Sequence, residues 1–252
     1  MSIIEKTDST AVVDHHTGEP LLKRLTSLQS VWILGVLLVI VVFFTITGGA
    51  KFLSASNFSL ISQNIAVWAV LGVGMTFVII TSGIDLSVGS VLVFSSVIAA
   101  KVMDAVGGDG WGTVAIGVLA ALVTGTAWGI LNGFLVAKSK IPALIVTLGS
   151  LSVALGLAQV VTGGIDIRSV PEALTDVNTY VRILGIPALP FIALVVLVVG
   201  GVVLHKTKFG RYTYAIGSNE LGARRVGINV DRHLIMVYAL SGLMAGMPAM
   251  RP

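Results

Sequence analysis

The residues best suited to chemistry in this sequence form one polar run, Thr81-Ser82-Gly83-Ile84-Asp85-Leu86-Ser87-Val88-Gly89-Ser90, inside a long apolar stretch. A carboxyl group at the centre of a membrane-spanning helix costs about 2.5–3.5 kcal/mol on insertion scales, so it is rarely placed there without a function. Backbone freed by glycine is tolerated at that depth only against protein or a water-filled cavity. The run therefore predicts the lining of a passage or the turn that shapes one. Its candidate residues are Thr81, Ser82, Gly83, Asp85, Ser87 and Gly89.

Two polar side chains allow more than one interpretation. Asp85 can line a passage, or it can cap a helix that starts near Leu86, where a carboxylate meets the positive helix end. The two roles of Asp85 are compatible. Asn132 can likewise face a passage, or its amide can hydrogen-bond across two helices.

The composition identifies an integral membrane protein. The chain has 252 residues, of which 55% are hydrophobic and only 11% are charged, with a mean hydropathy of +0.98. Soluble domains carry about 25% charged residues. The absence of cysteine excludes disulfides, thiolate catalysis and Cys-ligated metal sites. No basic stretch is interleaved with aromatic residues, so nothing suggests nucleic-acid binding.

The sequence also lacks the motifs of the commonest catalytic sites. None of the four histidines has HExxH spacing, and no nucleophile elbow occurs. No GxxxxGK[ST] loop is present, so the chain cannot bind ATP by that device. We expect a protein that is not an enzyme and that holds neither a metal nor a cofactor.

The positioning elements are apolar windows, which predict an all-α, polytopic helix bundle of about seven transmembrane segments with a polar break near 81–90. Residues 1–30 form an N-terminal tail, and 31–252 form the transmembrane domain. Its first helix is expected to be retained rather than cleaved as a signal peptide. The windows lie at about 31–47, 58–80, 86–103, 113–137, 143–162, 188–204 and 233–248. The region 58–103 forms either two crossings or a broken helix with a re-entrant piece.

Positive residues predict the orientation of these segments. With a cytoplasmic N-terminus, alternation places most Lys and Arg inside and leaves only Lys51, Arg168 and Arg182 outside. Because Lys and Arg in short loops favour the cytoplasm, this asymmetry predicts a multi-pass protein with its N-terminus inside. The region 163–187 then becomes an external loop, which is either a plain connection or a docking surface.

Two further patterns concern packing and partners. Gly125, Gly129 and Gly133 are four residues apart, so they share one helix face and predict close approach of a neighbouring helix. The cytoplasmic loop 205–232 contains a short helix, capped by Ser218 or Asn219 and stopped near Gly227. A helix of about two turns is marginal in water by itself, so it predicts docking onto a partner protein rather than onto anionic lipid.

Several separated motifs resemble the permease subunits of ribose/xylose/arabinose-type sugar ABC importers. They are Gly74-Met75-Thr76, the run 79–90, Asn132-Gly133-Phe134-Leu135-Val136, Ile141-Pro142 and Ile145-Val146-Thr147-Leu148-Gly149. The segment that contains Gly217, Ser218, Asn219, Glu220, Ala223, Arg224 and Gly227 is similar to the family's cytoplasmic contact with its ATPase. The resemblance covers about 50–250. Family members continue for further helices, so the chain is expected to be truncated or altered at its C-terminus.

The resemblance implies a permease domain at 31–252 that translocates a sugar inward, such as ribose, across the cell inner membrane. Its implied partners are a second permease copy in a homo- or heterodimer, an ATP-binding subunit below 205–232, and an extracytoplasmic sugar-binding protein. The residues also allow a different class, an ion-coupled secondary transporter that uses Asp85 in a broken helix. Uptake driven by an ion gradient without an ATPase would identify that second class.

Overall fold

The computed structural model describes residues 29–165, 167 and 170–248, so the expected tail up to residue 28 lies outside the described part. The chain divides into two units, residues 1–58 and 59–252. In the first, an apolar helix α2 (Gln29–Gly48) is followed by a 3₁₀ turn η1 (Gly49–Lys51), and α3 (Ala55–Ile80) begins.

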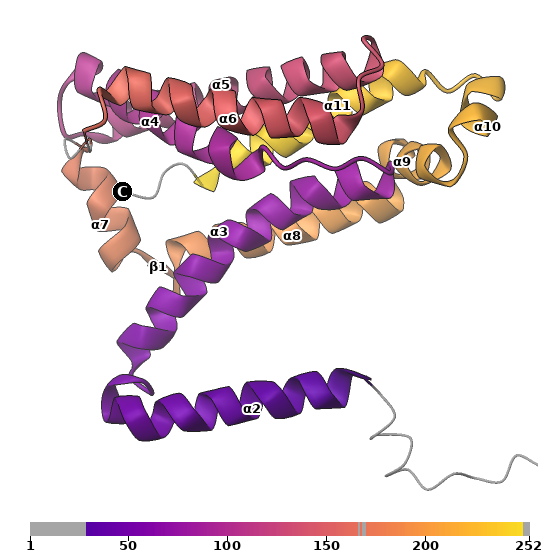
Figure 1. The fold of residues 1–252 in the computed structure, drawn as a ribbon. Helices are drawn as coiled ribbons and strands as arrows, with labels where there is room; N and C mark the ends of the chain where they lie inside the picture. Colours follow the sequence, from indigo (N-terminus) through magenta and orange to yellow (C-terminus); the bar gives the residue numbers. More distant parts are fainter. Residues whose placement is uncertain (1–28, 166, 168–169, 249–252) are drawn as a thin grey trace, which may run out of the picture. The chain divides into compact units, whose positions relative to one another are not determined.

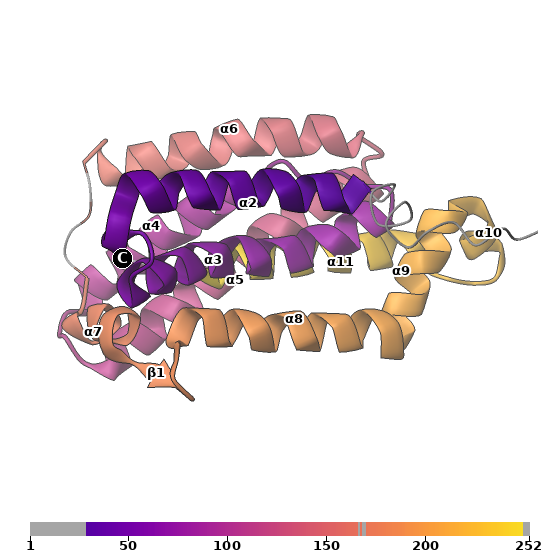
Figure 2. The ribbon, with the colours of Figure 1, turned by 90° about the horizontal axis from the view of Figure 1, so that it is seen from below.

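The second unit is a bundle of antiparallel helices (Figure 1). After α3 it contains α4 (Val88–Val106), α5 (Trp111–Ala137), α6 (Ala143–Thr162), α7 (Glu172–Tyr180), β1 (Arg182–Ile183), β2 (Ile186–Pro187), α8 (Ala188–Lys206), α9 (Lys208–Ser218), α10 (Glu220–Arg225) and α11 (Val230–Gly246). In Figure 2, α6 and α8 lie on opposite sides of the bundle, with α3, α4, α5 and α11 between them.

The predicted all-α, polytopic bundle is confirmed. Six helices in the described residues are long and apolar enough to cross a membrane: Val31–Lys51, Ala55–Ile80, Val88–Val106, Trp111–Ala137, Ala143–Thr162 and Ala188–Lys206. The seventh expected segment is α11, which is shorter at 17 residues and lies inside the bundle. The region 58–103 forms two separate helices, each long and apolar enough to cross a membrane: α3 runs to one end of the bundle, and the chain then returns through the segment 81–87 into α4 (Figure 1).

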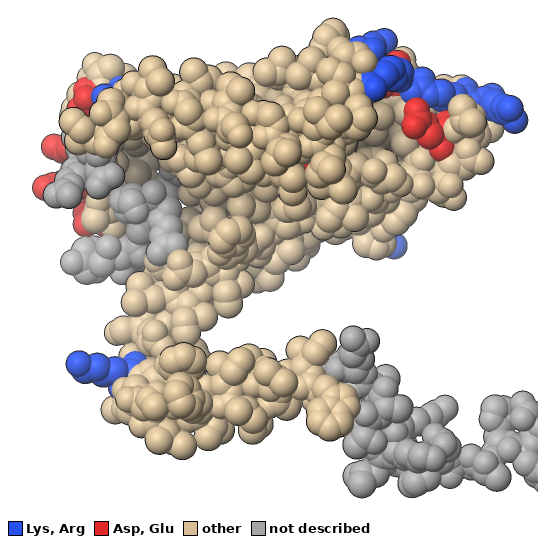
Figure 3. Space-filling model, viewed as in Figure 1, with Lys and Arg blue, Asp and Glu red and all other residues tan. Residues whose placement is uncertain are grey.

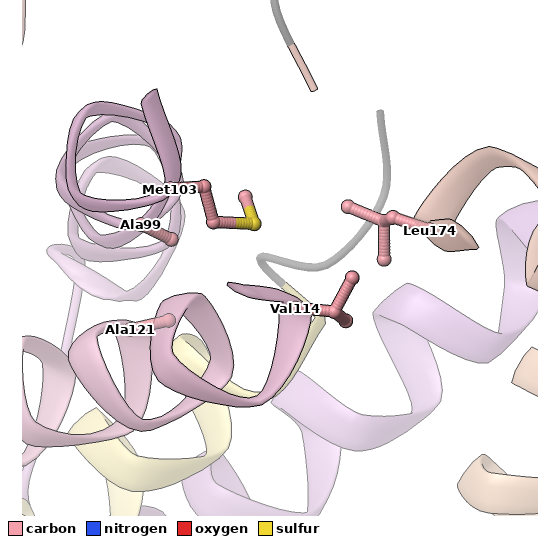
Figure 4. Close-up of a cluster of buried hydrophobic side chains, with 5 residues drawn as sticks. All are labelled: Ala99, Met103, Val114, Ala121 and Leu174. Carbon is pink, nitrogen blue, oxygen red and sulfur yellow. The ribbon is translucent and has the colours of Figure 1, made fainter. Parts of the chain in front are cut away.

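In its described residues, the region 163–187 has more regular structure than a plain connecting loop. It contains α7 and a two-stranded antiparallel hairpin, in which Ile183 pairs with Ile186. Leu184 and Gly185 connect the strands with φ values of 52° and 82°, the left-handed backbone that a tight hairpin turn needs. Leu174 of α7 is buried against Ala99 and Met103 of α4 and against Val114 and Ala121 of α5 (Figure 4). This apolar cluster holds α7 against the bundle.

Helix α11 is the centre of the second unit. Val237 and Tyr238 are buried with Phe77 and Val78 of α3 and with Leu204 of α8. About two turns further on, Met244 packs against Ala66 and Val70 of α3 and Ala193 of α8, while Ala245 meets Leu71 and Val91. Helix α11 thus contacts α3, α4, α5 and α8, and its residues can reach the polar segment that runs between α3 and α4.

Candidate functional site: the polar segment and the basic end

The polar segment 81–87 is extended chain that runs back along the bundle between α3 and α4 (Figure 1). Thr81 closes α3 by donating its hydroxyl to the Val78 carbonyl at 2.8 Å. Ser82 adopts a left-handed φ of 61°, which turns the chain, and its hydroxyl lies 3.5 Å from the Gly217 carbonyl of α9. The segment is therefore anchored to two helices at its first turn.

Asp85 lies at the centre of a buried hydrogen-bond network and is only 3% exposed. Its Oδ1 accepts the Ser87 hydroxyl at 2.7 Å and the Ser87 backbone N–H at 3.0 Å. Its Oδ2 accepts the Ser241 hydroxyl of α11 at 2.9 Å. Asp85 thus accepts a hydrogen bond from the N–H of Ser87, the residue just before α4, rather than from an N–H in the first turn of the helix. All the groups that donate to Asp85 here are uncharged.

Ser87 extends the network to a third helix. The Asn132 amide of α5 donates to Ser87 Oγ at 2.9 Å, and Asn132 is 2% exposed. Of the two roles that the sequence allowed for Asn132, the structure shows the hydrogen bond to another element, the segment that leads into α4. From α6, the Thr147 hydroxyl lies 3.2 Å from the Ile84 carbonyl. Side chains from α5, α6 and α11 therefore hold this irregular backbone, as buried polar backbone requires.

Glycines play two different parts around this network. An added Cβ at Gly83 would lie 2.8 Å from the Tyr238 hydroxyl oxygen, so Gly83 leaves room for that side chain. At Gly89 an added Cβ would meet no atom within 4 Å, and Gly89 is exposed. Gly83 belongs to the site by contact, whereas Gly89 does not.

The glycines of α5 lie directly against α11. A Cβ at Gly125 would collide with the Gly242 carbonyl, one at Gly129 with the Tyr238 carbonyl, and one at Gly133 with the backbone of Ile235. The two backbones are in contact along this face, which small residues allow. This packing helps to set where Ser241 of α11 lies along the helix axis relative to Asn132 of α5, and therefore the geometry of the hydrogen-bond network.

The residues 205–232 form two helices rather than one helix in a loop. The predicted helix is α10, where the Asn219 side chain accepts the Gly222 N–H at 2.8 Å and Gly227 has a φ of 85°. Ser218 instead ends α9, and an added Cβ at Gly217 would collide with the Ile80 carbonyl. Ala223 anchors α10 through a buried cluster with Ile216 and Val230.

Asp231, in the first turn of α11, links α10 to the turn between α5 and α6. It pairs with Arg224 of α10 at 2.5 Å, with Lys140 at 3.1 Å and with Lys138 at 3.6 Å. The Arg224 hydrogen bond lowers the pKa of Asp231 to about 2, and the same bond raises the pKa of Arg224. Arg224 also pairs with Glu220 at 2.9 Å, a bond within α10, so the ion pair with Asp231 is the one that ties Arg224 to another helix.

This end of the bundle is basic. Its elements carry Lys138, Lys140, Lys206, Lys208, Arg211, Arg224, Arg225 and Arg232. Figure 3 shows blue atoms gathered over α10 and the α5–α6 turn. The opposite end of the second unit carries Asp104, Asp109, Glu172 and Asp176, with Lys101 and Arg182 as its described cations. Among the described residues, no group of three or more His, Asp or Glu side chains could hold a metal ion.

Four residues of these sites were not predicted: Thr147, Asp231, Ser241 and Tyr238. Ser241 is a single hydroxyl in an apolar helix, and no local pattern distinguishes it from a packing residue. Thr147 stands within one of the motifs that carry the family resemblance, but that motif gave it no role. Asp231 could have been found, because an acid that follows Asn229 at a helix start is a recognisable cap sequence.

Comparisons with known proteins agree with this architecture. Residues 57–250 match the family described as "Branched-chain amino acid transport system / permease component". The chain is 38% identical over 200 residues to the ribose import permease protein RbsC of Escherichia coli (strain K12), a match that covers 78% of this chain and 61% of that protein. It is 35% identical over 213 residues to the autoinducer 2 import system permease protein LsrC of Salmonella typhimurium, covering 84% and 60%.

The chain therefore spans about 60% of the length of these curated relatives. No solved structure matches it at a significant level. The family match extends from α3 to the end of the described residues, so it includes the polar segment, the glycine face and α10. This chain is a multi-pass membrane protein that belongs to the permease-component family of the branched-chain amino acid transport systems.

Proposed function

We propose that the chain is the permease subunit of an ATP-driven importer that moves a sugar, such as ribose, inward. The observation that carries the proposal is α10, a helix of only 6 residues at the basic end of the bundle. Leu221 and Val226, within and directly after α10, are 70% and 77% exposed. These two exposed apolar side chains beside charged residues support a contact surface at α10, and we assign that surface to a protein partner.

The orientation follows from the distribution of charge. Because Lys and Arg favour the cytoplasmic side, the end that carries α10 is cytoplasmic and the end that carries α7 faces outward. The N-terminus is then cytoplasmic, and the protein lies in the cell inner membrane. An ATP-binding subunit would contact α10, an extracytoplasmic sugar-binding protein would meet the α7 end, and a second permease copy would complete the passage.

The polar network supports a structural role for Asp85 beside that passage. A carboxylate that carried a proton or sodium ion would need access to water or an ion path. Asp85 is instead buried, and both of its oxygens accept hydrogen bonds from serine residues. These contacts favour the ATP-driven class over the ion-coupled one.

The test is association with the ATP-binding subunit of the same transport system. Leu221→Glu, placed on the exposed face of α10, is expected to reduce co-purification of that subunit at least about tenfold, because a charge replaces an apolar contact. Ala223→Pro removes the N–H that bonds the Asn219 carbonyl at 2.9 Å and is expected to abolish association.

Leu184→Glu is the matched control, since Leu184 is 88% exposed at the opposite end. It is expected to leave association unchanged, and all three variants are expected to insert into the membrane. Undiminished co-purification with Leu221→Glu and Ala223→Pro would refute the docking role of α10. Uptake driven by an ion gradient in vesicles without the ATPase would refute the proposed class.

A further inference from the structure

A cavity of about 300 Å³ opens at the basic end of the bundle, next to the polar segment. Its walls come from Thr81, Ser82 and Gly83, from the α5–α6 turn, from Glu220 of α10, and from Leu234 and Tyr238 of α11. The volume is at the lower end of the range for pockets that bind small molecules. The cavity is therefore large enough for a ligand of monosaccharide size.

One residue that lines the cavity, Tyr238, carries a buried and unpaired hydroxyl. Tyr238 is 1% exposed, and its hydroxyl has no hydrogen-bond partner. The oxygen points at Gly83, where an added Cβ would lie only 2.8 Å away, and Gly83 lines the cavity. A buried hydroxyl without a partner costs free energy, so such groups in folded proteins normally meet a ligand or an ordered water.

The charges around the cavity are already paired, which indicates the kind of ligand. Lys140 bonds Asp231 at 3.1 Å, and Glu220 pairs with Arg224 at 2.9 Å. A charged ligand would have to displace these pairs or remain uncompensated. The Thr81 and Ser82 hydroxyls already donate to the Val78 and Gly217 carbonyls, so their oxygens offer neutral acceptors, and the Tyr238 hydroxyl offers a neutral donor. Apolar side chains suited to the C–H faces of a sugar ring complete the lining: Val136, Ile141, Pro142, Ala143 and Leu234.

We propose that this cavity binds a neutral, hydroxyl-rich molecule of monosaccharide size, with the Tyr238 hydroxyl as its buried hydrogen-bonding group. The proposal rests on the proposed function, because it takes the transported sugar as the ligand after it has reached the cytoplasmic side. The occupied cavity would contact both the polar segment and Glu220 of α10. Sugar accumulated in the cytosol would thereby hold α10 in place and oppose its movement with the ATPase.

A single introduced cysteine tests the site, since the chain has none of its own. Ser82→Cys places a thiol in the cavity wall, and its reaction with N-ethylmaleimide in inside-out vesicles reports access. D-ribose is expected to slow that reaction in a saturable manner, and ribose 5-phosphate is not. Ser139→Cys, on the exposed α5–α6 turn outside the cavity, is the matched control and should react equally with or without ribose.

Tyr238→Phe in the Ser82→Cys background removes only the unpaired hydroxyl. It is expected to raise the half-protecting ribose concentration about tenfold, the effect of losing one buried hydrogen bond. Tyr212→Phe, on the exposed part of α9, should cause no shift.

Three results would overturn the binding proposal. Ribose could fail to protect the thiol of the Ser82→Cys variant, it could protect the thiol of the Ser139→Cys variant equally, or Tyr238→Phe could leave the protection unchanged. Stronger protection by ribose 5-phosphate than by ribose would overturn the neutral class of ligand.

An independent measurement avoids the cysteine variants altogether. D-ribose should raise the unfolding temperature of the detergent-purified chain, and Tyr238→Phe should reduce that increase. Neither experiment includes the ATP-binding subunit. Ribose protection together with intact ATPase binding by the Leu221→Glu variant would refute the proposed docking role but retain the site, whereas the opposite pattern would refute only the site.

Discussion

At the scale of single residues, the structure makes Asp85 an acceptor for serine residues of two elements. We expect Asp85→Leu to lower the free energy of unfolding by about 1–3 kcal/mol for each donor left unsatisfied, namely the Ser87 N–H, the Ser87 hydroxyl and the Ser241 hydroxyl. Asp85→Asn should fold nearly normally, because one oxygen still serves Ser87 and the Ser241 hydroxyl can turn to accept. Thermal unfolding of the purified variants measures this difference.

The control for Asp85 is Asp109→Leu, which changes an exposed carboxylate in the loop between α4 and α5 and should leave the unfolding temperature unchanged. Equal destabilisation by Asp85→Asn and Asp85→Leu would contradict the network. Transport by the Asp85→Asn variant also distinguishes the ATP-driven class from the ion-coupled class. An ion-coupled transporter that used Asp85 would lose transport in this variant even if the protein folds.

Asp231 provides a prediction on pH. The Arg224 hydrogen bond lowers the pKa of Asp231 from its ordinary value of 3.8 to about 2 in the folded protein. The ion pair that ties α10 to Asp231 therefore stabilises the fold fully above about pH 3.8, and this stabilisation is lost as the pH falls through 2. A spin label at Leu221→Cys should therefore become more mobile over that interval, as measured by its EPR spectrum, although the Ala223 cluster still holds α10. With Asp231→Asn added, the label should already have that higher mobility at neutral pH and show no such transition; unchanged mobility would argue against the attachment.

At the scale of elements, the contact between α5 and α11 depends on missing side chains. Gly129→Ala is expected to destabilise the bundle by about 1–3 kcal/mol, because the new methyl group would overlap the Tyr238 carbonyl and the backbone of Ala239. Gly112→Ala on the same helix meets no atom within 4 Å and should be neutral or slightly stabilising. Unfolding in a denaturing detergent series compares the two, and equal stability would contradict backbone contact at Gly129.

The elements differ in how well the sequence predicts them. The long helices follow from apolar windows, since only such runs can cross a bilayer, and α10 follows from Asn219, Glu220 and Gly227, which carry local cap signals. Helix α9 was missed because its polar sequence KFGRYTYAIGS is typical of a loop, yet Thr213 and Ile216 bury one face of it. Helix α7 was missed because Leu174 supplies its main contact with the core. A single apolar residue cannot show the repeated spacing by which an amphipathic helix is recognised in a sequence.

The polar site was predicted in part for the same reason. Asp85 and Ser87 are conspicuous because they interrupt an apolar run, and Asn132 is a lone amide in an apolar helix. Their partner Ser241 is 156 residues from Asp85 in the chain. The packing of α11 against α3 and α5 brings that hydroxyl to the carboxylate, and a local sequence pattern contains no information about such a distant contact.

At the scale of the whole molecule, sidedness determines which end each partner can reach, and it is tested with two single-cysteine variants. Arg225→Cys lies at the exposed end of α10, and Asp109→Cys lies exposed at the opposite end of the second unit. In intact spheroplasts, a membrane-impermeant maleimide should label the Asp109→Cys variant, and it should label the Arg225→Cys variant only after permeabilisation. Labelling of the Arg225→Cys variant from outside would place α10 beyond the reach of any ATPase. The basic end would then face the substrate-binding protein instead, and the proposed import mechanism would be wrong.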